Sequence, residues 1–146
     1  MNKFQQAITF TLPHEGGYVN HPNDPGGETN LGISKRSYPD EDIKNLTVAR
    51  AMEIYNKDYW TANNLDSVPS PLCIVLFDMF VNMRPTTVTR LRQEAGDDWK
   101  KLIQKRKDFY GKLCMQNPKN EVFLKGWLNR SNDLSKYCSI LEQEQR

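Results

Sequence analysis

The part of the sequence best suited to chemistry is a glutamate followed by a loop rich in glycine, proline, asparagine and aspartate. Glu15 ends an apolar, helix-like segment, and the loop brings further polar side chains at Asp24, Glu28 and Thr29. A carboxylic acid at the inner end of an apolar helix is partly removed from water, which favours the protonated form that a general acid needs. A second carboxylate that orders a water molecule would complete the pair used in glycoside hydrolysis.

Each of these residues also has an ordinary structural interpretation. Glu15 could be a surface glutamate at a helix end, although the two glycines after it let the backbone pass close to a bulky ligand. Asp24 lies in Asn-Asp-Pro-Gly-Gly, where an aspartate commonly hydrogen-bonds its own turn. Glu28 could replace Asp24 as the second carboxylate, and the hydroxyl of Thr29 could help to hold the water. We therefore keep Asp24 and Glu28 as alternatives.

Aromatic and amide side chains could bind a sugar near Glu15. Carbohydrate sites combine flat apolar faces with directional hydrogen-bonding groups. Tyr18 lies in the loop beside Glu15, and Asn30 and Asn82 offer amide donors and acceptors. We predict Tyr18, Glu28, Asn30 and Asn82 as substrate-binding residues. The other aromatic side chains of the N-terminal half are more typical of a core, and these are Tyr38, Tyr55, Tyr59 and Trp60.

The composition excludes several classes of function. The chain has 146 residues, enough for one domain, with 26% charged residues and a net charge of +2. This balance gives no argument for a nucleic acid partner. No segment approaches the roughly 20 apolar residues of a membrane span, so no membrane insertion is expected. Because the first residues lack the features of a signal peptide, we expect the chain to be made in the cytoplasm and to need delivery to any outer substrate.

No metal or cofactor is predicted. The three cysteines, Cys73, Cys114 and Cys138, are far apart and form no C-x-x-C pair, and only His14 and His21 could join them in a metal site. Reduced cysteines packed as small apolar side chains are the simpler interpretation. We expect His14 to flank the end of the first helix and His21 to lie in the loop.

Helical periodicity predicts a mainly helical single domain with one long irregular loop. Apolar residues recur at helical spacing over residues 3–14, where Pro13 should kink or end the helix. Residues 16–46 hold too much proline and glycine for a regular helix, with short extended pieces around 32–34. The run 72–81 is apolar all round, like a buried central helix. Further helix starts are indicated at Thr47, Ser70-Pro71, Gly96-Asp97-Asp98 and Asn117-Pro118.

The same residues resemble the signature of the glycoside hydrolase family 108 N-acetylmuramidases, which include phage endolysins and secretion-associated bacterial muramidases. The resemblance begins with Glu15-Gly16-Gly17-Tyr18 and continues over residues 24–34, which read DPGGETNLGIS. It extends over most of the chain. Its later parts are Tyr55, Tyr59-Trp60, Leu76-Phe77-Asp78-Met79, Val81-Asn82-Met83 and the segment 123–130, FLKGWLNR.

The resemblance implies a mainly α, lysozyme-like α+β fold for residues 1–146, with residues 97–146 forming the C-terminal helices. It also implies a bacteriolytic hydrolase that cleaves the β-1,4 bond between N-acetylmuramic acid and N-acetylglucosamine. Glu15 would be the general acid, and Glu15, Asp24 and Thr29 resemble the Glu, Asp, Thr order of phage lysozymes, with Thr29 one position early. The implied partner is the bacterial peptidoglycan glycan strand, reached in the periplasm or cell wall through a holin or secretion machinery.

Two departures from the family pattern leave alternatives open. Arg84 stands where the family usually has glycine, and residues 86–98 replace a longer segment with peptidoglycan-binding Asp-Gly and Gly-Pro-Lys-Thr motifs. One alternative is a lytic transglycosylase, in which Glu15 acts alone and a hydroxyl of the sugar attacks. The other is a non-catalytic relative that binds the wall or a secretion partner.

Overall fold

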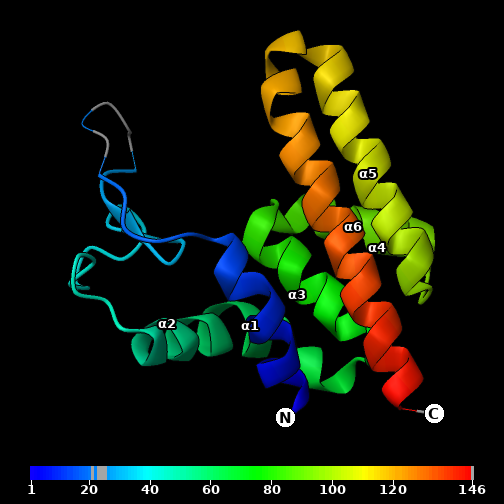
Figure 1. Cartoon of the computed structure of the whole chain (residues 1–146), viewed down its shortest axis with the longest axis horizontal. Coiled ribbons are helices and arrows are strands. Elements are labelled where there is room, and N and C mark those ends of the chain that lie inside the picture. The colour runs from blue at the N-terminus through cyan, green and yellow to red at the C-terminus, as the bar shows by residue number, and fades with distance from the viewer. Residues whose placement is uncertain (21, 23–25, 146) are drawn as a thin grey trace. The chain divides into compact units, whose positions relative to one another are not determined.

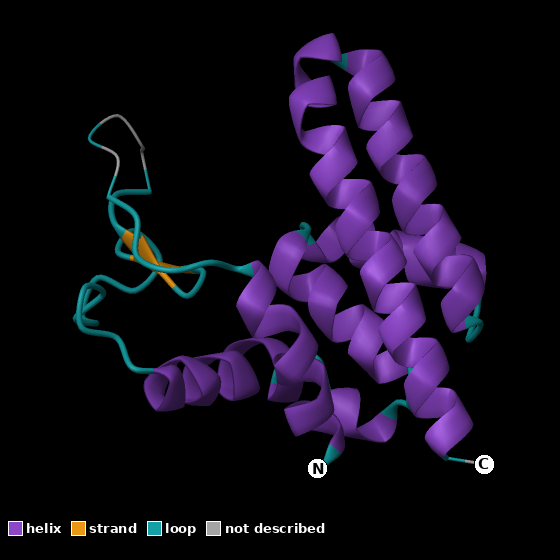
Figure 2. Cartoon of the chain, in the orientation of Figure 1, coloured by secondary structure: helices purple, strands orange, loops and turns teal. Residues whose placement is uncertain are grey.

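Helices dominate the computed structural model of this chain, which describes residues 1–20, 22 and 26–145 (Figure 1). Within these residues the strands form one small antiparallel pair, so the predicted mainly α fold class is confirmed (Figure 2). No described helix combines the length and the apolar character that a membrane span requires. The chain forms two units, Met1–Asn64 and Leu65–Arg146, and the single-domain organisation stays a prediction. His21 and Asp24 lie outside the described residues.

The first unit begins with α1 (Lys3–His14), which has the predicted bounds. Asn2 and Gln5 form a capping box: the Gln5 N–H donates to Asn2 Oδ1 (2.8 Å), and the Asn2 N–H donates to Gln5 Oε1 (2.9 Å). Pro13 lies in the last turn, and the helix ends one residue later as expected. The helix therefore stops immediately before Glu15.

A β-hairpin organises the loop after α1. Strands β1 (Thr29–Asn30) and β2 (Ile33–Ser34) pair antiparallel, and Val19 pairs with Thr29 on the other side through two backbone hydrogen bonds of 2.8 Å. The two residues of the turn, Leu31 and Gly32, have φ values of 53° and 80°. A two-residue turn with positive φ at both positions matches the twist of a hairpin. The predicted extended piece around 32–34 is thus the second strand.

The helix predicted to start at Thr47 is α2 (Val48–Tyr55), and the Thr47 hydroxyl accepts from the Arg50 N–H at 3.1 Å. The helix continues as a π-helical segment, Asn56–Thr61. Trp60 in this segment is buried, and its ring meets Phe4 of α1 edge to face with centroids 5.7 Å apart. The apolar face of α1 and the π-helical segment therefore share a core.

The second unit is built on α3 (Leu72–Asn82), whose residues are buried from Leu72 to Met79 as its apolar run predicts. The start predicted at Ser70-Pro71, with the Ser70 hydroxyl as cap and Pro71 as the first helical residue, is one residue early. Pro71 is itself the N-cap, and the Ser70 hydroxyl accepts from Gln145 Nε2 at 3.2 Å. A helix that the sequence did not predict, α4 (Pro85–Ala95), follows after Arg84. Its inward face consists of Val88, Leu91 and Ala95, and this is a weak apolar signal.

Two long helices complete the second unit. α5 (Trp99–Gln116) and α6 (Glu121–Glu144) form a hairpin (Figure 1), joined by a 3-10 turn at Pro118–Asn120. Asp98 caps α5 by accepting from the Lys100 and Lys101 N–H groups, at 3.0 and 3.1 Å. The start predicted at Asn117-Pro118 is the 3-10 turn rather than the α-helix.

Candidate active site

Glu15 lies where α1 gives way to the loop. It is the C-cap of α1, and its N–H donates to the Leu12 carbonyl at 3.1 Å. Its side chain is half-buried. Gly16 follows with a φ of 79°, so the chain leaves the helix through a conformation that favours glycine.

The turn of the β-hairpin lies directly against the Glu15 side chain. A Cβ atom placed on Gly32 would lie 2.9 Å from the Cβ and 3.0 Å from Oε1 of Glu15, and it would overlap the hydroxyl of Tyr55. Only a residue without a side chain leaves room for the carboxylate here. Gly32 therefore holds the hairpin turn and the Glu15 carboxylate in close contact.

Tyr55 fixes the same turn from α2. Its side chain is buried, and its hydroxyl donates to the Leu31 carbonyl at 2.7 Å. Leu31 has a positive φ, a conformation that is unfavourable for a leucine and persists only where neighbouring groups hold it. α1, the hairpin turn and α2 thus meet around the Glu15 carboxylate.

Two further tyrosines and an aspartate lie near this point. The Tyr38 hydroxyl donates to Asp58 Oδ2 at 2.7 Å, and the ring of Tyr59 lies 5.4 Å from that of Tyr55. Burial, the charge of Asp58 and, more weakly, the charge of Glu15 raise the pKa of Tyr59. Burial and the bond to Asp58 also raise the pKa of Tyr38. Both hydroxyls therefore remain protonated donors at neutral pH.

Three of the predicted residues, Tyr18, Glu28 and Thr29, lie where the chain after α1 pairs with the start of β1. The exposed Tyr18 donates its hydroxyl to Glu28 Oε2 at 2.7 Å, and this carboxylate raises the pKa of Tyr18. Glu28 and Thr29 are half-buried, and Thr29 is also the first residue of β1. Pairing between Val19 and Thr29 brings the Tyr18 segment and the Glu28 segment together. The catalytic and binding roles of these residues stay predictions.

Asn30 has a structural part in this loop. It is nine-tenths buried, and its Nδ2 donates to the carbonyls of Ile43 at 3.0 Å and Lys44 at 3.4 Å. These bonds tie β1 to the segment before α2, where the Ile43 side chain is completely buried. The predicted role of Asn30 in substrate binding stays a prediction.

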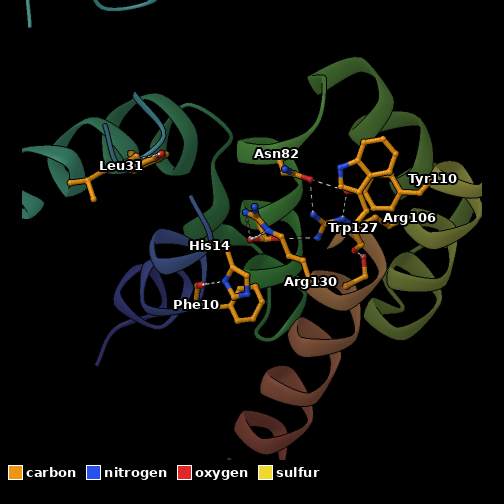
Figure 3. A network of polar contacts seen from close by, with 11 residues as sticks. Phe10, His14, Leu31, Asn82, Arg106, Tyr110, Trp127 and Arg130 are labelled. Atoms are coloured by element: carbon orange, nitrogen blue, oxygen red, sulfur yellow. Dashed lines mark hydrogen bonds and ion pairs between the residues drawn. The ribbon is translucent and has the colours of Figure 1, made fainter. Parts of the chain in front are cut away.

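Asn82 lies in the second unit, at the end of α3, in a polar network (Figure 3). Its Oδ1 accepts from Arg106 Nη2 at 3.0 Å and from the Tyr110 hydroxyl at 2.8 Å. Arg106 also donates to Asp78 Oδ2 at 2.7 Å, and Arg130 donates to Asp78 Oδ1 at 2.8 Å. The substrate-binding role of Asn82 stays a prediction.

The Asp78 network is a buried set of charges. Asp78 and Arg106 are completely inaccessible, and Arg130 is 9% exposed. Burial alone would raise the pKa of Asp78, but the two guanidinium groups outweigh it and lower this pKa to about 2. Asp78 and Arg130 both fall in segments of the family resemblance, and here they pair α3 with α6. This pairing identifies a structural role for the two residues.

Several residues of the candidate site were not predicted from the sequence to act in it. Gly32 and Tyr55 contact Glu15 or its hairpin turn, and Tyr38, Asp58 and Tyr59 lie close by. The aromatic residues of α2 and its π-helical continuation were the sequence signal for Tyr55 and Tyr59, whereas Gly32, Tyr38 and Asp58 had no such signal. His14 is held within α1, since its Nδ1 lies 2.8 Å from the Phe10 carbonyl (Figure 3). Among the described residues, no cluster of three or more His, Cys, Asp and Glu side chains could hold a metal ion.

Comparisons with known proteins found one matching family model and a similar solved structure. A family model described as Glycosyl hydrolase 108 matches residues 8–83, which include every described residue of the candidate site. A solved structure titled "Structure of Brucella abortus SagA" is similar over 93% of this chain and 94% of that chain, with a TM-score of 0.72 and 24% sequence identity. No curated protein matches the sequence. The structural likeness shows a shared fold.

Proposed function

Since the chain belongs to the glycosyl hydrolase 108 family, it is a lysozyme-like glycoside hydrolase that acts on peptidoglycan, and we propose that Glu15 is its general acid. The bond that we propose it cleaves is the β-1,4 bond between N-acetylmuramic acid and N-acetylglucosamine. The observation that carries this proposal is the contact of the Glu15 carboxylate with the hairpin turn at Gly32. A carboxyl group held in one place at a helix end is suited to proton transfer.

The mechanism needs a proton at the leaving oxygen and a nucleophile at the sugar carbon. Protonated Glu15 donates to the glycosidic oxygen, and a positioned acid of this kind contributes on the order of 10²–10⁴ to the rate. Positive charge then develops at the sugar carbon, and a carboxylate stabilises it or orders the attacking water. Glu28 offers such a carboxylate with one hydrogen bond from Tyr18, and Asp24 is the alternative. The Thr29 hydroxyl could help to hold the water.

The surroundings of Glu15 also offer groups that could bind a sugar. The ring of Tyr18 is exposed and could stack on a sugar face, and its hydroxyl orients Glu28. The hydroxyl of Tyr59 is protonated and can hydrogen-bond a sugar, whereas the Tyr38 hydroxyl already donates its proton to Asp58. We further propose that the enzyme works in the periplasm or cell wall, reached through a holin or secretion machinery.

The test is Glu15→Gln, which keeps the shape of the side chain and removes its acidity. We expect the release of reducing ends from purified peptidoglycan to fall by at least about 10²-fold, with an unchanged melting temperature. Glu53→Gln is a matched control, because Glu53 is an exposed glutamate on α2, and it should retain the full rate. Full activity of the Glu15→Gln protein would reject Glu15 as the acid.

The products of the reaction distinguish this proposal from its alternatives. Mass spectrometry of the released fragments should show products that have gained water, with N-acetylmuramic acid at the reducing end. Products that carry 1,6-anhydro sugars would identify a lytic transglycosylase instead. Wall binding without release of reducing ends at any pH would identify a non-catalytic relative.

A further inference from the structure

The second unit contains a groove that the proposed reaction does not use. It has a volume of about 510 Å³, within the range of small-molecule sites. Its lining includes the aromatic rings of Phe109 and Trp127 and three polar side chains, Asn82, Arg84 and Thr87. We call it the Arg84 groove.

The aromatic wall of the groove is held in place before any ligand binds. Trp127 stacks on Tyr110, with centroids 4.8 Å apart and an angle of 23° between the rings (Figure 3). Phe123 stacks on Trp127 at 5.7 Å. Tyr110 is buried, and its hydroxyl is bound to Asn82 and Arg106. Little side-chain entropy would be lost when a ligand covers a wall fixed in this way.

The amide of Asn82 is fixed as well. Because Oδ1 accepts from Arg106 and Tyr110, the orientation of the amide is determined and its Nδ2 is directed away from these donors. In the described part of the chain, this Nδ2 has no hydrogen-bond acceptor. Asn82 therefore presents oriented N–H donors among the residues that line the groove.

Arg84 adds a positive charge. Its side chain is exposed, and it forms no ion pair or hydrogen bond with any residue that the structure describes. It is also the N-cap of α4, a helix that no side chain caps, so the positive end of the helix dipole adds to the charge of the guanidinium. The lining of the groove therefore combines hydrogen-bond donors and a positive charge with aromatic and apolar side chains.

We propose that the Arg84 groove binds a carboxylate of the peptide stems of peptidoglycan, an inference that rests on the proposed function. A guanidinium pairs with a carboxylate through two parallel, charge-assisted hydrogen bonds, and the Asn82 amide can donate to the same group. A neutral sugar could stack on the aromatic wall, but it would leave Arg84 without a counter-charge. The peptide stems carry carboxylates beside small aliphatic side chains, which match the two sides of the groove.

The first experiment measures binding without hydrolysis. The whole protein, labelled with ¹⁵N, is titrated with a synthetic stem tetrapeptide, and the indole signal of Trp127 is followed by NMR. The same peptide with its carboxylates amidated and an N-acetylglucosamine oligomer are titrated in parallel. We expect the carboxylate peptide to shift the Trp127 signal and to bind at least about tenfold more tightly than the amidated peptide.

Charge variants test the role of Arg84. Arg84→Gln should weaken the binding of the carboxylate peptide about tenfold and leave that of the amidated peptide unchanged. Arg90→Gln is the matched control, because Arg90 is an exposed arginine on the same helix and outside this groove, and its affinity should equal that of the unmodified protein. Melting temperatures of both variants show whether the fold is intact.

The results separate this proposal from the proposed function. Equal binding of the two peptides, no shift of Trp127, or binding of the sugar oligomer alone would overturn the proposal, whatever the enzyme hydrolyses. Binding of the carboxylate peptide that depends on Arg84 would support it, even if the Glu15→Gln variant remained active.

Discussion

Replacing Gly32 with alanine perturbs the contact on which the proposed acid depends. The new Cβ would lie 2.9 Å from the Cβ and 3.0 Å from Oε1 of Glu15, and it would overlap the Tyr55 hydroxyl. Tyr55 is buried and bonded to the Leu31 carbonyl, so it has little freedom to move. We expect the Glu15 carboxylate or the hairpin turn to be displaced.

Two energies contribute to the effect on stability. An alanine with the φ of 80° found at Gly32 costs about 1–2 kcal/mol because of its backbone conformation. Forcing a methyl group into an occupied space costs a further 1–3 kcal/mol, roughly. We therefore expect the free energy of unfolding to fall by about 2–5 kcal/mol. A displacement of about 1 Å at the acid would lower kcat by about 10²-fold.

Gly27→Ala is a control that separates the backbone cost of alanine from the cost of steric overlap. Gly27 has a φ of 72°, but among the described residues the nearest atom to its added Cβ is Lys35 Cβ at 3.9 Å, so the backbone cost is the one that applies. Chemical denaturation and the release of reducing ends from peptidoglycan are measured for both variants. Equal kcat values for the Gly32→Ala and Gly27→Ala proteins would refute the reasoning. The double variant Gly32→Ala/Tyr55→Phe removes the overlap with the hydroxyl but also the hydrogen bond to the Leu31 carbonyl. It should not regain kcat, because Glu15 would still be displaced.

Two further predictions concern residues that support the fold. The pKa of Asp78 is about 2 in the folded protein and ordinarily 3.8, so its ionised form contributes stability above the ordinary value. This contribution of about 2 kcal/mol should be lost as the pH falls from about 4 to about 2, and acid denaturation curves followed by circular dichroism should show it. Asp78→Asn should remove this acid-dependent loss and lower the free energy of unfolding at pH 7 by about 3–5 kcal/mol, because two buried guanidinium groups lose their counter-charge; an unchanged midpoint in urea would contradict the network. Asn30→Ala should lower the free energy of unfolding by about 0.5–1.5 kcal/mol, since it removes the hydrogen bonds of a buried amide to the Ile43 and Lys44 carbonyls while the Ile43 carbonyl still accepts from the Leu46 N–H at 3.2 Å. A rise in KM for peptidoglycan at a temperature where Asn30→Ala is fully folded would instead indicate contact with substrate.

Local sequence signals predicted the helices that carry their own start, stop and periodicity. α1 has the predicted bounds because its apolar spacing and Pro13 lie within the helix and its capping asparagine, Asn2, lies directly before it. Thr47 and Asp98 cap α2 and α5 as their hydroxyl and carboxylate predict. α4 was not predicted, since few of its side chains face the core and a polar helix gives little periodic signal.

The sequence predicted some residues of the candidate site but not the residues that surround Glu15. Glu15 was identified because a carboxylate beside a glycine-rich loop is a local pattern. Gly32 was expected only within an extended piece, and Tyr55 was expected in the core, where it lies. Gly32 is 17 positions and Tyr55 is 40 positions from Glu15 in the sequence, and folding brings all three together. No spacing rule connects residues at such separations.

The charged residues of the second unit likewise have partners that the sequence did not predict. Arg106 interrupts an apolar helical pattern, and the sequence alone offered no partner for it. In the folded chain it pairs with Asp78 of α3, which also pairs with Arg130 of α6. The chain alone thus specifies the ends of those helices that carry strong local signals, and which carboxylate could donate a proton, because these depend on neighbours within one or two turns. Which groups surround that carboxylate, and which charges neutralise each other inside the protein, follow only from packing, because burial brings distant residues within hydrogen-bond distance.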